Sequence, residues 1–166
     1  MTLPAPSALQ STSAGSQRLV RRRSDSLRAL RYRRAARIFS PDVSRSYVEY
    51  RNPQHPGQSS LGIAYIEAEQ YKIVRPDFLF FAKQGGKVVV DLVDPHGLHL
   101  ADALPKLQGL ALYAETHAAC YRRMVSVAET KGNLRALDLT REEVRKAIAA
   151  AKDAASLFSG ALAQDY

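Results

Sequence analysis

Two aspartates stand beside or within runs of apolar residues. Asp77 follows Pro76 and precedes four apolar residues, and Asp91 interrupts the β-branched run 87–93. A carboxylate in such surroundings is costly unless it is paired or binds a cation. If the chain brings the two carboxylates together, they can hold one hard cation, and Mg²⁺ suits a site of few carboxylates and several waters. Alternatively, Asp77 terminates a strand after Pro76, and Asp91 accepts backbone hydrogen bonds or pairs with an arginine.

The elements that must position these carboxylates are two strands. Residues 77–81 form a short apolar run and residues 87–93 a β-branched run, and both patterns are typical of buried strands. Gly85 and Gly86 between them predict a tight turn, so the two strands should form a hairpin. Side chains alternate along a strand, which puts Asp91 and Val93 on one face.

Further elements follow on both sides of this hairpin. We predict an edge strand at 62–74, a turn at 94–97, a helix at 101–117, strands at 124–128 and 134–139, and a helix at 140–158. Thr140 and Glu143 have the spacing of a capping box at the start of the last helix, and Gly160 should end it. The order predicts an α/β fold with a central mixed β-sheet flanked by helices.

The segments around these strands resemble the PD-(D/E)XK nuclease family. Arg75-Pro76-Asp77, the strand–turn–strand unit and Asp91 carry this resemblance. The stretch 88–115, VVVDLVDPHGLHLADALPKLQGLALYAE, is similar to the C-terminal nuclease-like part of DEAD/DEAH helicases related to type III restriction subunits. The resemblance implies a restriction-endonuclease-like core and metal-dependent phosphodiester cleavage in DNA. It also implies that Asp77 and Asp91 are catalytic residues that ligate Mg²⁺.

One position departs from the family's pattern. The family's lysine should stand two residues after the second acid, where this sequence has Val93, which cannot stabilise developing negative charge. Either Lys106 on the following helix supplies the charge for a Mg²⁺-dependent endodeoxyribonuclease, or the domain is a catalytically degenerate nucleic-acid-binding or partner-docking module. His96 and Gln108 are candidate substrate contacts. The chain lacks ATPase motifs, so a helicase motor would come from a partner or from a missing N-terminal portion.

Histidine and cysteine spacing offers a further alternative. His96 and His99 form one pair and His117 and Cys120 another, at a separation near that of structural zinc sites. The predicted helix between the pairs is about 25 Å long. This length holds the pairs apart and disfavours zinc.

Positive charge is concentrated at the start of the chain. The net charge is +8; residues 1–40 hold nine arginines and one acid, whereas residues 41–166 hold fifteen Lys/Arg and fifteen Asp/Glu. A basic segment of this kind is typical of phosphate contacts with nucleic acid, although a solvated tail or an organellar transit peptide has a similar composition. The candidate nucleic-acid-binding residues are Arg21, Arg22, Arg23, Arg31, Arg33 and Arg34.

Composition also sets the domain plan. We predict a basic, disordered or partly helical arm at 1–40, a linker or loop rich in proline at 41–60, and the nuclease-like α/β domain at 61–160. Apolar residues make up 46% of the chain, which is enough for one core. No run of eighteen apolar residues occurs, so no membrane span is expected. The single cysteine, Cys120, favours a reducing cytoplasm.

Overall fold

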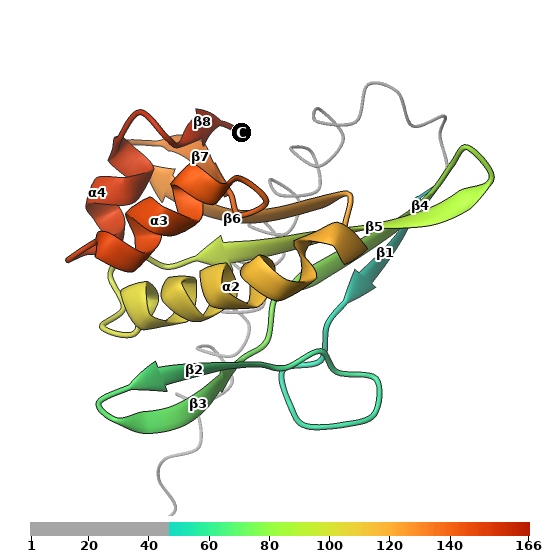
Figure 1. The fold of residues 1–166 in the computed structure, drawn as a ribbon, viewed down its shortest axis with the longest axis horizontal. Coiled ribbons are helices and arrows are strands. Elements are labelled where there is room, and N and C mark those ends of the chain that lie inside the picture. The colour runs from blue at the N-terminus through green and yellow to red at the C-terminus, as the bar shows by residue number, and fades with distance from the viewer. Residues whose placement is uncertain (1–46) are drawn as a thin grey trace, which may run out of the picture. The chain divides into compact units, whose positions relative to one another are not determined.

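The computed structural model describes residues 47–166, in which α-helices pack on a six-stranded sheet (Figure 1). The elements in chain order are β1 (Tyr47–Arg51), β2 (Ile63–Glu67), β3 (Gln70–Val74), β4 (Phe78–Gln84), β5 (Lys87–His96), α2 (Ala103–His117), the 3₁₀ turn η1 (Ala118–Cys120), β6 (Arg123–Thr130), β7 (Asn133–Asp138), α3 (Glu142–Ala150), α4 (Ala154–Ser159) and β8 (Gln164–Asp165).

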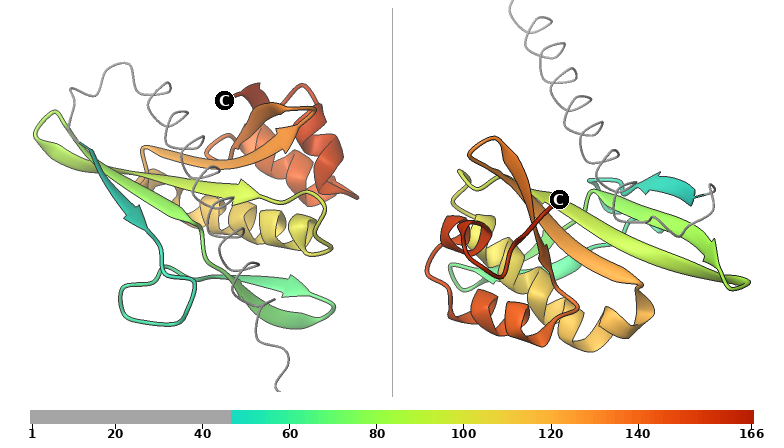
Figure 2. Two further views of the ribbon diagram at one scale, coloured as in Figure 1. Left: turned by 180° about the vertical axis from the view of Figure 1, so that it is seen from behind. Right: turned by 90° about the horizontal axis from the view of Figure 1, so that it is seen from above.

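The large sheet has the strand order β1-β4-β5-β6-β7-β8. Strands β5 and β6 are parallel, and every other neighbouring pair is antiparallel. Helix α2 makes the crossover that a parallel pair requires. In Figure 2, α2, α3 and α4 lie against one face of this sheet. An α/β fold with a mixed central sheet and helices packed on it is therefore confirmed.

The hydrophobic core lies between the sheet and these helices. The alternation along β5 turns Leu92 toward α2, where Leu107 and Leu110 are fully buried. Helices α3 and α4 complete the same core. Its other fully buried side chains are Ala114, Met124, Ala128, Leu137, Leu139, Val144, Ile148 and Phe158.

The predicted hairpin is confirmed as β4 and β5. The two strands are antiparallel, and Gly85 and Gly86 join them with φ angles of 56° and 77°. Such positive φ angles are open to glycine without steric cost. This turn sets the register of the two strands on which the candidate site depends.

The single edge strand predicted at 62–74 is instead a second hairpin. Strands β2 and β3 form a separate antiparallel sheet whose turn places Ala68 and Glu69 at φ 48° and 61°. Neither turn residue is a glycine, so the sequence carries no strong turn signal here. Tyr65 of β2 packs onto α2 at Gly109, where an added Cβ would lie 2.4 Å from the Tyr65 Cβ. Gly109 therefore allows the close approach of the small hairpin.

The domain boundaries at 61 and 160 are too narrow. Strand β1 lies inside the predicted linker and pairs with β4, with Tyr47 opposite Ala82 and Arg51 opposite Phe78. At the other end β8 pairs with β7. Pro41, Pro53, Pro56 and Gly57 flank the five-residue strand and made the segment 41–60 look like a loop.

The turn predicted at 94–97 is mostly strand. Strand β5 continues to His96 and pairs with β6 there, with Asp94 opposite Ser126 and Pro95 opposite Val127. Strand β4 begins at Phe78, opposite Val93, so β5 has only β6 as a neighbour beyond that point. A proline is tolerated where one side of a strand is unpaired.

The predicted C-terminal helix is two helices, α3 and α4. No side chain caps α3, and the expected capping box does not form, because the N-cap residue is Arg141 rather than Thr140. The Thr140 hydroxyl donates to Asp138 Oδ1 at 2.6 Å. Asp153 caps α4, accepting from the Ser156 amide at 2.7 Å. Gly160 ends α4, as predicted. Within the described residues, no helix combines the length and hydropathy that crossing a bilayer requires.

Candidate functional site

The strand register does not bring Asp77 and Asp91 together. Asp91 lies opposite Phe80, and Phe78 lies opposite Val93. Continuing this antiparallel register by one residue places Asp77 opposite Asp94 instead. Because side chains alternate along β5, Asp94 faces the helices and Asp91 faces the other side of the sheet. The predicted pairing of Asp77 with Asp91 is therefore wrong.

Asp91 forms an ion pair with Arg122. Arg122 Nε donates to Asp91 Oδ1 at 2.8 Å, and the Arg122 Nη2 donates to Asp91 Oδ2. The hydrogen bonds from this guanidinium, aided by the carboxylate charge, raise the pKa of Arg122 above its ordinary value, against the effect of burial. Asp91 is buried, and this pairing with an arginine is the alternative that the sequence left open.

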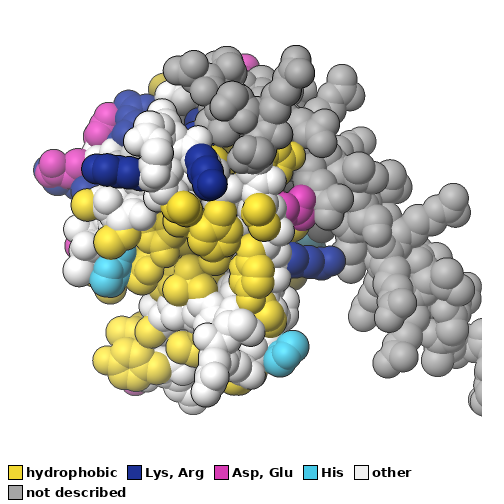
Figure 3. Space-filling model, turned by 90° about the vertical axis from the view of Figure 1, so that its right-hand side faces the viewer, with side chains coloured by type: hydrophobic (Ala, Val, Ile, Leu, Met, Phe, Trp, Pro, Cys, Tyr) yellow, Lys and Arg dark blue, Asp and Glu magenta, His cyan; other side chains and the backbone are white. Residues whose placement is uncertain are grey.

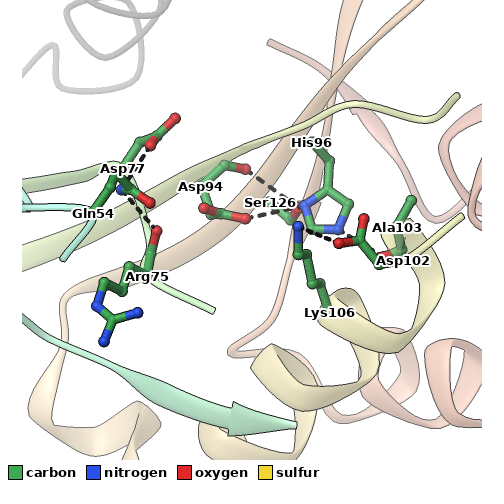
Figure 4. Close-up of polar contacts among 9 residues, drawn as sticks. All are labelled: Gln54, Arg75, Asp77, Asp94, His96, Asp102, Ala103, Lys106 and Ser126. Atoms are coloured by element: carbon green, nitrogen blue, oxygen red, sulfur yellow. Dashed lines mark hydrogen bonds and ion pairs between the residues drawn. The ribbon is translucent and has the colours of Figure 1, made fainter. Parts of the chain in front are cut away.

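Asp77 and Asp94 instead share a pocket of about 180 Å³ at the end of β5, beside the start of α2. The polar residues that line it are Gln54, Arg75, Asp77, Asp94, His96, Asp102 and Lys106. Figure 4 shows Asp77 and Gln54 on one side, Asp94 in the middle and His96 with Lys106 on the other. Residues from β5, α2 and the loop before β4 thus converge on one small polar cavity.

The loop between β1 and β2 fixes Asp77. The buried Asn52 side chain donates from Nδ2 to the Leu61 carbonyl and accepts at Oδ1 from the Leu61 backbone N–H, each at 2.8 Å. The backbone N–H of Asn52 donates to the Asp77 carbonyl at 2.9 Å. The Gln54 amide donates to Asp77 Oδ1 at 3.1 Å and to the Arg75 carbonyl at 3.1 Å. These contacts hold the carboxylate at the mouth of the pocket.

Asp94 and His96 form a buried pair on β5. His96 Nδ1 lies 3.0 Å from Asp94 Oδ2, and His96 Nε2 lies 2.7 Å from the Ala103 carbonyl oxygen. Burial is the largest influence on the pKa of His96 and lowers it. The hydrogen bond and charge of Asp94 and the hydrogen bond to Ala103 together outweigh burial, so the pKa of His96 lies above its ordinary value. Ser126 Oγ is 3.3 Å from the same Nδ1.

Lys106 reaches this pocket and Gln108 does not. Lys106 Nζ, in the first turn of α2, forms an ion pair at 2.6 Å with Oδ2 of Asp102, the residue that precedes this helix. Gln108 Nε2 donates instead to the Ile148 carbonyl at 3.4 Å, which ties α2 to α3. His96 lines the pocket from β5 rather than from a turn. The predicted substrate contact at Gln108 is therefore replaced by a packing contact.

The sequence did not indicate some residues that line this pocket, and several of its candidate residues lie outside the described part of the chain. The sequence assigned Asp94 to a turn. Asp94 is three residues after Asp91, and side chains an odd number of residues apart point to opposite faces of a strand, so this spacing was the available signal. Gln54 carried no signal, because it lies in a loop far from Asp77 in sequence. The candidate nucleic-acid-binding arginines, Arg21, Arg22, Arg23, Arg31, Arg33 and Arg34, lie outside the described residues.

Within residues 47–166, no group of three or more His, Cys, Asp or Glu side chains is arranged to hold a metal ion. His96 stands before α2, whereas His117 ends it and Cys120 follows in η1. Helix α2, which is fifteen residues long and ends at His117, separates the two pairs considered for zinc.

An apolar depression lies apart from the polar pocket. It has a volume of about 490 Å³ and is lined mainly by Tyr50, Leu61, Leu79 and Phe81, with Ser59 and Ser60 at its edge. Figure 3 shows hydrophobic side chains gathered on this side of the molecule. Exposed apolar surface of this kind is typical of contact sites for other molecules.

Comparison with known proteins identifies the family. A family model described as the YagJ family matches residues 36–166. The curated Protein YagJ of Escherichia coli (strain K12) is 74% identical over 117 residues, which cover 70% of this chain and 48% of that protein. The chain thus spans about half the length of this curated relative. No solved structure matches the chain. The chain belongs to the YagJ family.

Proposed function

We propose that the protein cleaves phosphodiester bonds in DNA, with a divalent metal held by Asp77 and Asp94. The observation that carries this proposal is that the two carboxylates line one pocket with Lys106 and His96. Carboxylates with room for water are suitable ligands of Mg²⁺. A metal bound there would polarise the scissile phosphate and lower the pKa of an attacking water. Asp94 takes the role that the resemblance gave to Asp91.

The surrounding side chains have separate tasks in this proposal. Gln54 orients the Asp77 carboxylate through its 3.1 Å hydrogen bond. In the family's pattern a lysine stands two residues after the second acid. If Asp94 is that acid, the corresponding position holds the polar His96. If Asp91 were that acid, the position would hold the apolar Val93. Lys106 supplies positive charge at the pocket, and Asp102 holds it there until a phosphate competes for its ammonium group.

The fold and the arm support the choice of substrate. The β4–β5 hairpin has both acids at its open end, Asp77 just before β4 and Asp94 near the end of β5. With the crossover helix α2 and the parallel strand β6 that follow, it is compatible with a restriction-endonuclease-like core. The basic arm supports DNA as the polymer, since arginines neutralise phosphates. We include a helicase or ATPase partner and a cytoplasmic location in the proposal, on the resemblance and the single cysteine.

Nicking of supercoiled plasmid tests this proposal. The full chain with Mg²⁺ or Mn²⁺ should nick the plasmid, EDTA should stop it, and Asp77→Asn should abolish it. Glu115→Gln, on the exposed side of α2, is the matched control and should leave the rate unchanged. Absence of nicking by the unaltered chain with either metal, or nicking that resists EDTA, overturns the proposal.

A second candidate is a partner-docking module without catalysis. The apolar depression at Tyr50, Leu61, Leu79 and Phe81 favours it, because a nuclease pocket does not account for this surface. The ion pair between Lys106 and Asp102 also favours it, since a lysine neutralised by its neighbour contributes less to catalysis. Metal-independent DNA binding without nicking, together with loss of partner binding in Phe81→Ser, would support this reading over the first.

A further inference from the structure

The outer face of the β2–β3 hairpin is apolar and exposed. The two strands pair Ile66 with Tyr71 and Ala64 with Ile73, so these four side chains share one face. Tyr65, on the opposite face, packs onto α2, beside which the hairpin lies (Figure 1). Tyr71 is 82% exposed, Ile66 59% and Ile73 47%. Because the three large side chains are neighbours on one face, they form a contiguous apolar patch, which is typical of a contact site.

This outer face leads to the polar pocket. Ile73 and Arg75 line the pocket together with Asp77. Alternation along β3, continued by one residue, puts Arg75 on the same side of the chain as Tyr71 and Ile73. At about 3.3 Å per residue, Tyr71 and Arg75 are about 13 Å apart. A row of side chains thus runs from an exposed tyrosine to the edge of the cavity that holds the carboxylates.

Arg75 adds an uncompensated positive charge at the pocket end of this row. Within residues 47–166 its guanidinium makes no ion pair, and its Nε is shielded from solvent without a hydrogen-bond acceptor. Figure 4 shows its side chain pointing away from Asp94. The acid and the lysine of the hairpin strands, Glu67 and Lys72, pair with each other at 2.9 Å, and Glu69 lies in the turn at the other end. A planar guanidinium without a counter-ion is a suitable ligand for a phosphate.

The combination of these features favours a nucleic-acid strand over a protein partner. A protein would have to supply a carboxylate for Arg75 at the rim of a polar cavity, whereas a nucleic-acid strand carries a phosphate at every nucleotide. Surfaces that bind single strands combine positive charge along the backbone with aromatic side chains on which bases stack. Tyr71 and Arg75 provide one of each on the same side of the chain.

We infer that the outer face of the β2–β3 hairpin binds single-stranded DNA and directs it to the pocket. Tyr71 stacks on an unpaired base, the two isoleucines contact the neighbouring base and sugar, and Arg75 binds a backbone phosphate. A base inside a duplex has no free face for the tyrosine ring, so this surface selects unpaired DNA. The inference rests on the proposed function for the path of the strand toward Asp77 and Asp94, and it names the form of DNA that this site takes.

Fluorescence anisotropy of the full chain in EDTA, with a single-stranded oligonucleotide and its duplex as probes, tests this inference. EDTA prevents metal-dependent cleavage, so the assay measures binding alone. Tyr71→Ala should weaken single-strand binding at least about fivefold and duplex binding by less than about twofold. Tyr71→Phe keeps the ring and should bind as the unaltered chain does. Arg75→Gln should make the dependence of log K on log salt less steep by about 0.7 for the single strand.

Two control variants match the lost apolar surface and the lost charge. Val88→Ala and Lys87→Gln replace exposed residues at the start of β5, and both should leave the preference between the two probes unchanged. The basic arm is present in every variant, so differences between variants report the hairpin.

The outcomes separate this inference from the proposed function. Equal losses with both probes in Tyr71→Ala, or no loss with either, overturn the inference. A change in the sedimentation of Tyr71→Ala without DNA also overturns it, because the outer face is then a contact between copies of the chain. Single-strand binding that depends on Tyr71, without plasmid nicking, leaves the inference intact and removes the proposed function. Nicking with unchanged single-strand affinity in Tyr71→Ala does the reverse.

Discussion

At the scale of single residues, the two acids on β5 have different surroundings. Asp91 makes two hydrogen bonds with Arg122, whereas Asp94 lines the pocket with Asp77. Both acids lie in an apolar run, so composition alone cannot rank them. The strand register distinguishes them. In an antiparallel hairpin the numbers of paired residues have a constant sum, so the register that pairs Phe78 with Val93 places Asp77 opposite Asp94 rather than Asp91.

The Asp91–Arg122 pair leads to a stability prediction. Asp91→Asn removes the charge opposite Arg122, whose side chain is only 22% exposed. We expect a loss of about 2 kcal/mol in the free energy of unfolding, less than for a wholly buried pair because Arg122 keeps some solvent. Urea denaturation measures the loss, and metal binding at the Asp94 pocket should persist. Unchanged stability with lost metal binding would return the site to Asp91.

At the scale of elements, local patterns predicted five of the central strands and helices, whereas β1 was missed, β2 and β3 were expected as one strand, and α3 and α4 as one helix. The β4–β5 hairpin, α2, β6 and β7 follow from apolar periodicity and from the Gly85–Gly86 turn. Strand β1 could not be predicted, because its five residues gain their place only by pairing with β4. The capping box at Thr140 does not form because α3 begins at Glu142 and Arg141, not Thr140, occupies the N-cap position.

The packing of β2 on α2 can be tested at Gly109. Gly109→Ala places a Cβ about 2.4 Å from the Tyr65 Cβ, so the small hairpin must shift. We expect a net destabilisation of about 1–2 kcal/mol, because overpacking exceeds the gain in helix propensity. Gly57→Ala is the control, since an added Cβ meets nothing there within 4 Å. Thermal unfolding that shows both variants equally stable would contradict this packing.

Helix capping offers a second test at this scale. Asp153→Ala removes the acceptor for the Ser156 amide at the start of α4 and should cost about 1 kcal/mol. Asp153→Asn should retain most of the stability, because its side-chain oxygen still accepts. Chemical denaturation compares the three proteins. An equal loss in both variants would point to charge rather than to the cap.

At the scale of the whole molecule, the basic residues and the candidate site lie in different segments. Charge composition indicates a polyanion partner but says nothing about chemistry, and the pocket depends on contacts between Asp77 and Gln54 that are far apart in sequence. The class of fold could therefore be predicted from the sequence, whereas the full set of residues that line the pocket could not. Lys106 and His96, named from the sequence as candidate site residues, line the pocket, and so does Asp94, which the sequence assigned to a turn.

The arm leads to a prediction about salt. Replacing Arg21, Arg22 and Arg23 by glutamine should make the dependence of log K on log salt less steep by about 2–3, because each phosphate contact contributes about 0.9. Fluorescence anisotropy with a DNA duplex measures this slope. Replacing three exposed lysines of the domain, Lys83, Lys131 and Lys152, by glutamine is the charge-matched control. An equal change of slope in both sets would exclude a specific role for the arm.

The central claim is that Asp77 and Asp94, not Asp77 and Asp91, form the reactive site. Nicking of supercoiled plasmid by Asp94→Asn and Asp91→Asn, compared below the melting temperature of both variants, tests it most directly. We predict that Asp94→Asn loses at least about 100-fold in rate, whereas Asp91→Asn stays within about tenfold of the unaltered protein. Loss of nicking in Asp91→Asn with full activity in Asp94→Asn would contradict the account.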